Sequence, residues 1–213
     1  MFEWIREWIL KLIGRDKKIS LGFYGAPNVG KTSLANRIAM DLAGEPVGIV
    51  SMVPHETRAV QNKERVVLHV NGYKLTMNLL DMPGVAVKVD YRDFLNYGLS
   101  VDQAKQRARE ATKGIIEAIK WMENVDAALL VVDSTRDPSE QVNVTLLGNL
   151  EARGIPVIMV ANKIDLENSN AQKYKETFAD YPLVPVSALN GTNMFLLYRK
   201  IGDAVKTRKK ASM

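Results

Sequence analysis

At 213 residues and 23.8 kDa the chain has the size of a single domain, and we expect one sizeable hydrophobic core. A composition of 46% hydrophobic and 25% charged residues is typical of a globular protein and excludes a disordered or fibrous chain. The sequence contains no cysteine, which excludes disulfides, Cys-ligated zinc, iron–sulfur clusters and a thiol nucleophile.

The formal net charge of +5 belongs to the two ends of the sequence. Residues 1–18 carry a net charge of +2 and residues 206–213 carry +4, whereas residues 19–205 sum to −1. This near-neutral body argues against a nucleic-acid binder whose basic surface is built into its fold. The two basic ends could still contact an anionic surface.

Short apolar stretches alternate with helical periodicity, which predicts an α/β fold with helices on both faces of a mostly parallel sheet. The hairpin signal Asn71-Gly72 adds one antiparallel edge strand, and Ser100 with Gln103 forms a capping box. The expected strands are 19–24, 65–70, 73–80, 127–132, 155–160 and 183–186. The expected helices are about 31–43, 100–122, 138–152, 170–179 and 194–205.

The run Gly25-Ala-Pro-Asn-Val-Gly30-Lys31-Thr32 lies between the first strand and the first helix and matches the P-loop pattern G-x-x-x-x-G-K-[ST]. In this motif backbone N–H groups and the positive end of the helix face a phosphate. Lys31 is expected to reach the β- and γ-phosphates, and Thr32 to ligate Mg²⁺. The expected phosphate contacts are Gly25, Ala26, Pro27, Asn28, Val29, Gly30, Lys31, Thr32 and Ser33.

Two later motifs narrow the choice of nucleotide. Asp81-Met-Pro-Gly84 ends the second hairpin strand, where Asp81 can hold a metal-bound water and the Gly84 N–H can meet a γ-phosphate. Asn162-Lys163-Ile164-Asp165 follows a buried strand. Its final carboxylate can accept two hydrogen bonds from guanine. Adenine lacks this donor pair, so binding adenine would cost about 1.5–3 kcal/mol for each charged hydrogen bond that is lost. The motifs therefore predict GTP and GDP as ligands.

With these motifs in order, the chain resembles the Era-like branch of the translation-factor-related P-loop GTPases over about residues 18–206. The resemblance adds a switch-loop threonine, Thr57 in the run PHETR, which closes over Mg²⁺ and the γ-phosphate. It also adds a fifth motif beside the base, Ser187-Ala188-Leu189. It implies a Ras-like G domain at 18–206 that binds GTP and Mg²⁺ and hydrolyses the nucleotide.

The resemblance also assigns roles within this site. The implied Mg²⁺ ligands are Thr32, Thr57 and, through water, Asp81. The implied catalytic residues are Lys31, Thr57, Gly84 and Asn28.

Two features bear on the rate of hydrolysis. Ras-type enzymes carry a water-orienting Gln directly after the D-x-x-G glycine, whereas this chain has Val85, so we expect slow intrinsic turnover unless K⁺ or a partner assists. The resemblance suggests that Asn28 holds a K⁺ ion beside the phosphates; the alternative is that Asn28 only caps the turn. A nucleotide-binding scaffold with negligible hydrolysis also stays open, and the N-K-I-D motif disfavours a P-loop ATPase or kinase.

Residues 1–17 are expected to form an amphipathic helix ahead of the G domain. Its narrow polar stripe comprises Glu3, Arg6, Glu7 and Lys11, and its apolar face includes Trp4 and Trp8. Three interpretations compete. The helix packs on its own G domain or on a second copy in a homodimer, lies in a membrane interface through residues 1–13, or binds another protein. Separately, we expect the protein to act on an effector protein or the ribosome.

The other end, residues 207–213, is expected to be a basic tail that frays from the last helix. No apolar run approaches the roughly 20 residues that span a bilayer. We therefore expect a cytoplasmic protein, with peripheral contact at the inner membrane face as an option.

The segment between Gly84 and Ser100 is longer than a minimal switch and has a loop-like context, with Tyr91, Phe94 and Tyr97 in it. Core packing is one explanation of these aromatic side chains. The other is that the segment changes its contacts with the nucleotide and docks the N-terminal helix in one state.

Overall fold

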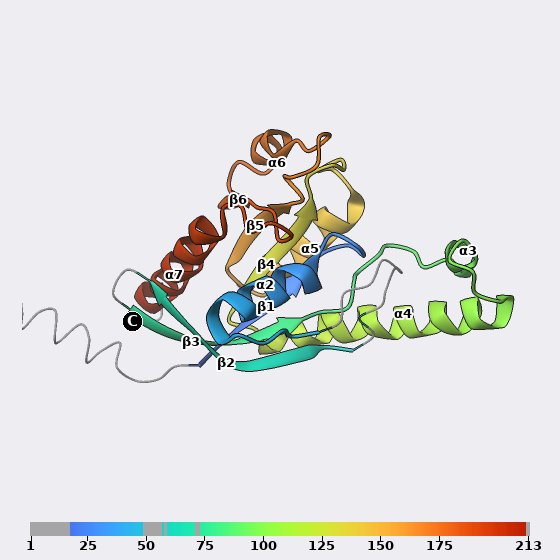
Figure 1. The fold of residues 1–213 in the computed structure, drawn as a ribbon, viewed down its shortest axis with the longest axis horizontal. Coiled ribbons are helices and arrows are strands. Elements are labelled where there is room, and N and C mark those ends of the chain that lie inside the picture. Colours follow the sequence, from blue (N-terminus) through green and yellow to red (C-terminus); the bar gives the residue numbers. More distant parts are fainter. Residues whose placement is uncertain (1–17, 49–56, 58, 71–72, 212–213) are drawn as a thin grey trace, which may run out of the picture.

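The structure is a computed structural model that describes residues 18–48, 57, 59–70 and 73–211. Six strands and the helices around them follow one another along the chain (Figure 1). The strands are β1 (Lys18–Tyr24), β2 (Gln61–Val70), β3 (Tyr73–Asp81), β4 (Ala127–Asp133), β5 (Val157–Asn162) and β6 (Leu183–Pro185). The helices are α2 (Lys31–Ala43), α3 (Tyr91–Leu95), α4 (Val101–Trp121), the short η1 (Met122–Asn124), α5 (Gln141–Ala152), α6 (Ala171–Thr177) and α7 (Met194–Ala211).

The strands form one sheet in the order β2-β3-β1-β4-β5-β6. Only the β2/β3 pair is antiparallel; every other neighbouring pair is parallel. The prediction of a mostly parallel sheet with one antiparallel edge is therefore confirmed. Because β1, β3, β4, β5 and β6 run the same way, the loops that follow them all emerge at one edge of the sheet.

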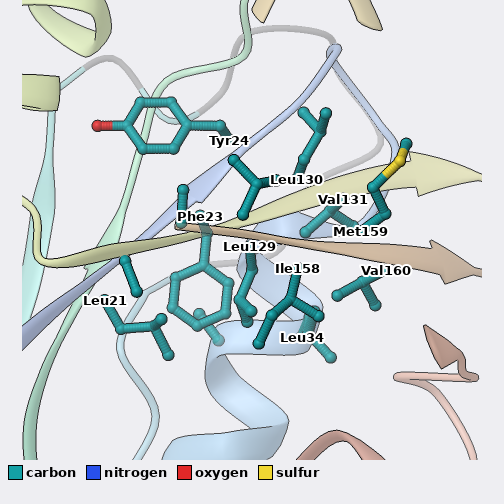
Figure 2. Packing of buried hydrophobic residues seen from close by; sticks show 14 of the residues in the cluster. Leu21, Phe23, Tyr24, Leu34, Leu129, Leu130, Val131, Ile158, Met159 and Val160 are labelled. Atoms are coloured by element: carbon teal, nitrogen blue, oxygen red, sulfur yellow. The ribbon is translucent and has the colours of Figure 1, made fainter. Parts of the chain in front are cut away.

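The core lies against the central strands. Every residue of β4 and β5 is buried, as expected for parallel strands covered on both faces. Figure 2 shows Leu21 and Phe23 of β1 beside Leu129 of β4, Ile158 of β5 and Leu34 of helix α2. Helix α7 lies beside α2, and the hydroxyl of Tyr198 donates to Asp41 over 2.7 Å. This packing fixes α2, and with it the loop that precedes the helix.

The sequence signals at the helix ends hold well. Gly44 ends α2 in the left-handed conformation with φ = 76°, and Ser100 and Gln103 form the predicted capping box at α4. Helix α7 continues past Val205 to Ala211, and the frayed basic tail at 207–213 stays a prediction. The hairpin signal Asn71-Gly72 and the N-terminal stretch 1–17 lie outside the described residues.

The loop-like context expected between Gly84 and Ser100 is also corrected. Asp90 caps helix α3 by accepting a hydrogen bond from the Arg92 N–H over 3.0 Å. Phe94 of α3 is buried against the first turns of α4 and forms a second apolar cluster with Ala104 and Ala111. Figure 1 shows that α3 and the first half of α4 project beyond the sheet. We call residues 89–113 the α3–α4 arm.

A last observation concerns the membrane. Within the part of the chain that the structure describes, no helix combines the length and the apolar character needed to cross a bilayer.

Candidate functional site

The P-loop folds in a way that only glycine permits at two positions. Gly25 has φ = 148°, and a Cβ there would lie 2.2 Å from the Val131 carbonyl oxygen. Gly30 has φ = 93°, and a Cβ there would lie 2.3 Å from the Asn162 side-chain nitrogen. Between them Asn28 adopts the left-handed conformation with φ = 61° and is exposed. The loop therefore packs tightly against β4 and β5 while its tip faces outward.

Lys31 begins helix α2 and curls back over the loop. Its ammonium nitrogen donates to the carbonyl oxygens of Gly25, over 3.2 Å, and of Ala26, over 2.8 Å. The side chain is only 6% exposed, and burial lowers the pKa of Lys31 to about 8. A cation held on two carbonyl oxygens in this loop is placed to meet a phosphate.

Three oxygen-bearing side chains meet beside the P-loop. The Thr32 hydroxyl donates to Asp81 Oδ2 over 2.6 Å and lies 3.2 Å from the Thr57 hydroxyl. Burial raises the pKa of Asp81, and the Thr32 hydroxyl and Lys31 oppose that shift. The second carboxylate oxygen, Oδ1, is buried and has no hydrogen-bond partner among the residues that the structure describes. Two hydroxyls and a carboxylate with an unsatisfied oxygen are donors that suit Mg²⁺.

The D-x-x-G turn presses against the P-loop. The Val85 N–H donates to the Gly25 carbonyl oxygen over 3.1 Å, and a Cβ on Gly84 would lie 2.9 Å from Pro27 Cα. Val85 itself is 5% exposed and belongs to the main hydrophobic core. The residue that follows Gly84 thus packs inward, and its apolar side chain offers no group that could orient water.

Asn162 braces three loops. Its side-chain nitrogen donates to the Val29 carbonyl oxygen over 2.9 Å, and its side-chain oxygen accepts from the Ala188 N–H over 3.0 Å. Ser187 is fully buried, and its hydroxyl oxygen accepts from the Asn190 N–H over 3.2 Å. Through Asn162 the P-loop, the N-K-I-D loop and the loop after β6 hold one arrangement.

The last residues of the N-K-I-D motif and of the Ser187-Ala188-Leu189 motif lie at the surface. Asp165 is exposed in the turn after β5, and Leu189 is 82% exposed.

The structure adds one residue that the motifs do not include. Asp133 ends β4 directly beside Asn162 in the sheet register and accepts a 2.6 Å hydrogen bond from the Lys163 ammonium group. Burial would raise the pKa of Asp133, but bonds from Lys163 and Thr135 outweigh it and hold the pKa below its ordinary value. In the sequence, Asp133 can be found as a carboxylate at the end of an apolar strand, the position where α/β sheets bind ligands.

The described site residues gather at the carboxyl-end edge of the sheet. Gly25 follows β1, Asp81 ends β3, Asp133 ends β4, Asn162 ends β5 and Ser187 follows β6. Ser33 lies half-buried in the first turn of α2. Of the switch run PHETR, Thr57 is described and its neighbours in the motif lie outside the described residues.

Residues 20–163 match the family described as 50S ribosome-binding GTPase. GTPase Era from Geobacter metallireducens is 30% identical over 187 residues, which cover 85% of this chain and 53% of Era.

Two solved structures of Era share the fold. Era of Aquifex aeolicus bound to GDP·AlF₄⁻ aligns with a TM-score of 0.65 at 23% identity, and Era with MgGDPNP and nucleotides 1506–1542 of 16S ribosomal RNA aligns with a TM-score of 0.60 at 26% identity. Each alignment covers 87% of this chain and 56% of the Era chain. The predicted Ras-like fold is confirmed, and the chain spans about half the length of these relatives.

Proposed function

Because the chain belongs to the family of 50S ribosome-binding GTPases, we propose that it is a molecular switch that binds GTP and GDP with Mg²⁺ and hydrolyses GTP to GDP and phosphate. One observation carries the proposal. Thr32, Thr57 and Asp81 meet beside the Lys31 ammonium group at the P-loop, and the buried Asp81 Oδ1 accepts no hydrogen bond from the described part of the chain. The two Era structures were solved with GDP·AlF₄⁻ and with MgGDPNP, ligands of the same class.

Different residues of the chain contact the phosphates and the metal ion. Lys31 neutralises the β- and γ-phosphates, and the N–H groups of the P-loop and Gly84 hold the phosphate oxygens. Thr32 and Thr57 would ligate Mg²⁺ directly and Asp81 through water. Bound Mg²⁺ would offset part of the charge on the phosphates.

Guanine selectivity belongs to the other loops. Asp165 accepts the two guanine donors, Asn162 keeps the loop backbone in place, and the Ala188 N–H and Leu189 border the base. The bond from Lys163 to Asp133 supports this assignment, because it holds the long Lys163 side chain at the edge of the sheet where the ring would lie. The test is a fluorescence titration with GTP, GDP and ATP: we expect GTP and GDP to bind and ATP to bind far more weakly.

Hydrolysis by the isolated chain is proposed to be slow. The residue directly after Gly84 is Val85, which is buried in the core and has no polar group to position the attacking water. We propose that Asn28, exposed at the tip of the P-loop, ligates a K⁺ ion that supplies the missing positive charge. Single-turnover hydrolysis is expected to be faster in K⁺ than in Na⁺, and Asn28→Ala should remove the difference. Equal rates in the two salts would contradict the K⁺ proposal.

The alternative of a scaffold with negligible hydrolysis rests on the same buried Val85. It predicts tight GTP binding with no phosphate release above that of a Lys31→Ala variant, whatever the salt. Phosphate release at saturating GTP with Mg²⁺ and K⁺ separates the two.

The partner of the switch is proposed to be the ribosome or an effector protein in the cytoplasm. The family description and the Era complex with 16S ribosomal RNA support a ribosomal partner. Co-sedimentation of the full chain with ribosomes, loaded with GDP or with a non-hydrolysable GTP analogue, tests it. Retention of the GTP-analogue form alone is expected.

Residues 1–13 are proposed to contact a membrane surface through their apolar side chains, with Trp4 and Trp8 at headgroup depth. Full-length protein should sediment with liposomes, and a Trp4→Glu, Trp8→Glu variant should not. If the variant instead turns a dimer into a monomer, as light scattering would show, the segment joins two copies of the chain.

A further inference from the structure

The solvent face of α4 carries a row of basic side chains. Lys105, Arg109, Lys113 and Lys120 are all exposed, and intervals of four, four and seven residues keep them on one side of the helix. At 1.5 Å per residue the row is about 22 Å long. The residues buried under the helix, among them Ala104, Ala111 and Ala118, lie on the opposite side. The row is therefore the outward face of the helix.

The acidic residues of α4 do not interrupt the row. Glu110 lies on the flank, where it accepts a 3.1 Å hydrogen bond from Gln106 and lies 3.8 Å from Arg107. Glu117 is on the same flank and accepts from the Val60 N–H over 3.5 Å. Asp102 precedes the row in the first turn, where a carboxylate favours the helix dipole. Between Lys105 and Lys120 the outward face thus presents only positive charge.

Two tyrosines of the α3–α4 arm are exposed, Tyr91 in α3 and Tyr97 in the turn after that helix. Tyr91 is 37% exposed and Tyr97 is 46% exposed, and the Lys105 ammonium group lies 5.8 Å from the centre of the Tyr91 ring. Nearby Asp90 is engaged by the Arg92 guanidinium group, although Asp93 adds one negative charge to the same helix. Cations beside exposed aromatic rings suit a ligand that has both phosphates and flat bases.

We propose that the α3–α4 arm is an RNA-binding surface. Phosphates would contact Lys105, Arg109 and Lys113, and unpaired bases would stack on Tyr91 and Tyr97. The arm follows Gly84 in the chain. Under the proposed function, the turn that contacts the nucleotide therefore leads directly into the RNA-binding surface. The near-neutral charge of residues 19–205 concealed this row, because an average over the body does not show where the charges lie.

An anionic membrane is the competing ligand for a basic helix. Membrane-surface helices bury a broad apolar face beside their basic residues. The outward face of α4 offers one large apolar side chain within the row, Ile116, which is 51% exposed. The observations therefore favour RNA, which needs charge and stacking and no apolar insertion.

The test measures the affinity of the full chain for a fluorescent, mixed-sequence single-stranded RNA of about 20 nucleotides, longer than typical single-strand sites. One variant combines Lys105→Glu, Arg109→Glu and Lys113→Glu. The control combines Lys175→Glu, Arg199→Glu and Lys200→Glu, which make the same charge change at exposed positions on α6 and α7. We expect the arm variant to bind at least tenfold more weakly and the control to change less than threefold.

Two further readings sharpen the result. Loss of three phosphate contacts should reduce the slope of log affinity against log salt by about 2, since each contact contributes about 0.7 for single strands. Tyr91→Ala with Tyr97→Ala should weaken binding to single-stranded RNA more than binding to a duplex of the same sequence. Equal losses in the two charge variants, or binding to phosphatidylglycerol vesicles without binding to RNA, would overturn the proposal.

Nucleotide titration of the same variants separates this inference from the proposed function. If all variants bind GTP and the arm variant keeps its RNA affinity, the RNA surface is wrong and the switch stands. If the chain binds no GTP but the arm variant alone loses RNA, the switch is wrong and the surface stands.

Discussion

The two halves of the site are built differently. On the base side, Asp133, Asn162 and Ser187 are all buried, and bonds through Asn162 and Lys163 join separate loops to one another. On the phosphate side, Thr57 lies 3.2 Å from the Thr32 hydroxyl, and the D-x-x-G turn is joined to the P-loop by one backbone bond, from Val85 to Gly25. Beyond that turn the chain passes into the projecting α3–α4 arm.

Under the proposed function, this difference would let one small domain both select a nucleotide and respond to it. The base side is preorganised, so its selectivity should not depend on which nucleotide state is present. The phosphate side has oxygen atoms and N–H groups whose best partners are a metal ion and a γ-phosphate, so it is the side that can change between states.

The largest effect is expected at Lys31, which serves the phosphates. Lys31→Ala removes the buried cation and its charge-assisted hydrogen bonds, at about 1.5–3 kcal/mol each, so GTP affinity should fall by at least about 100-fold. A fluorescent GTP analogue measures the loss. Lys175→Ala, at an exposed position on α6, should bind as the unchanged protein does; similar weakening in both would remove Lys31 from the site.

Asp165→Asn alters the base side alone. The amide offers a donor where guanine needs an acceptor, so GTP affinity should fall about 10- to 100-fold and xanthosine triphosphate should become the preferred ligand. Competition between the two nucleotides measures the change. Glu167→Gln is the matched control at an exposed position two residues further on. A variant that still prefers GTP would show that Asp165 does not read the base.

The pH dependence of binding isolates Lys31 without removing it. Burial lowers the pKa of Lys31 to about 8 from an ordinary value of 10.5, and phosphates bind the protonated form. GTP affinity should therefore fall as the pH rises through 8, by about tenfold at pH 9, and binding above pH 8 should take up a proton. In the Lys31→Arg variant the side chain stays charged, so GTP affinity should depend less on pH than in the unchanged protein. Identical profiles would contradict the assignment.

The same pKa shift sets the sign of a stability effect. Between pH 8 and 10.5 the unfolded chain binds a proton at Lys31 that the folded chain lacks, so this residue makes the ligand-free protein more stable as the pH rises through that window.

The smallest effect is expected at Asp133, which acts on the base side through Lys163. Asp133→Asn weakens the 2.6 Å charged bond to Lys163 but keeps an acceptor, so GTP affinity should fall about three- to tenfold. Asp137→Asn removes one carboxylate from the exposed pair with Lys173, 3.2 Å apart, and should have no measurable effect on binding. Equal affinities of the two variants would show that Lys163 needs no such support.

Motifs made the phosphate and base loops predictable, because each depends on residues at fixed spacing directly after an apolar strand. The roles of Gly25, Gly30 and Asn162 could be predicted from the sequence, because the chemistry of a tight loop leaves few alternatives at those positions. Asp133 could not, since its role comes from its register beside Asn162 on a neighbouring strand, about 30 residues away in sequence.

The α3–α4 arm shows a second limit. The periodicity between Gly84 and Ser100 is too short to predict α3, and the helix exists because Asp90 caps it and Phe94 packs on Ala104 and Ala111. The same packing decides that Phe94 is buried while Tyr91 and Tyr97 face solvent. Tertiary contacts thus decide which of the three aromatic residues is buried and which are exposed. The amino-acid composition of the segment does not predict this difference.

The central claim is that the chain hydrolyses GTP at the P-loop. Phosphate release under single-turnover conditions, with Mg²⁺ and K⁺ and either GTP or ATP, tests it most directly. We expect one phosphate released per bound GTP, slowly, none above background from ATP, and none from GTP in the Lys31→Ala variant. Equal release from ATP, or release from GTP that Lys31→Ala leaves unchanged, would contradict it.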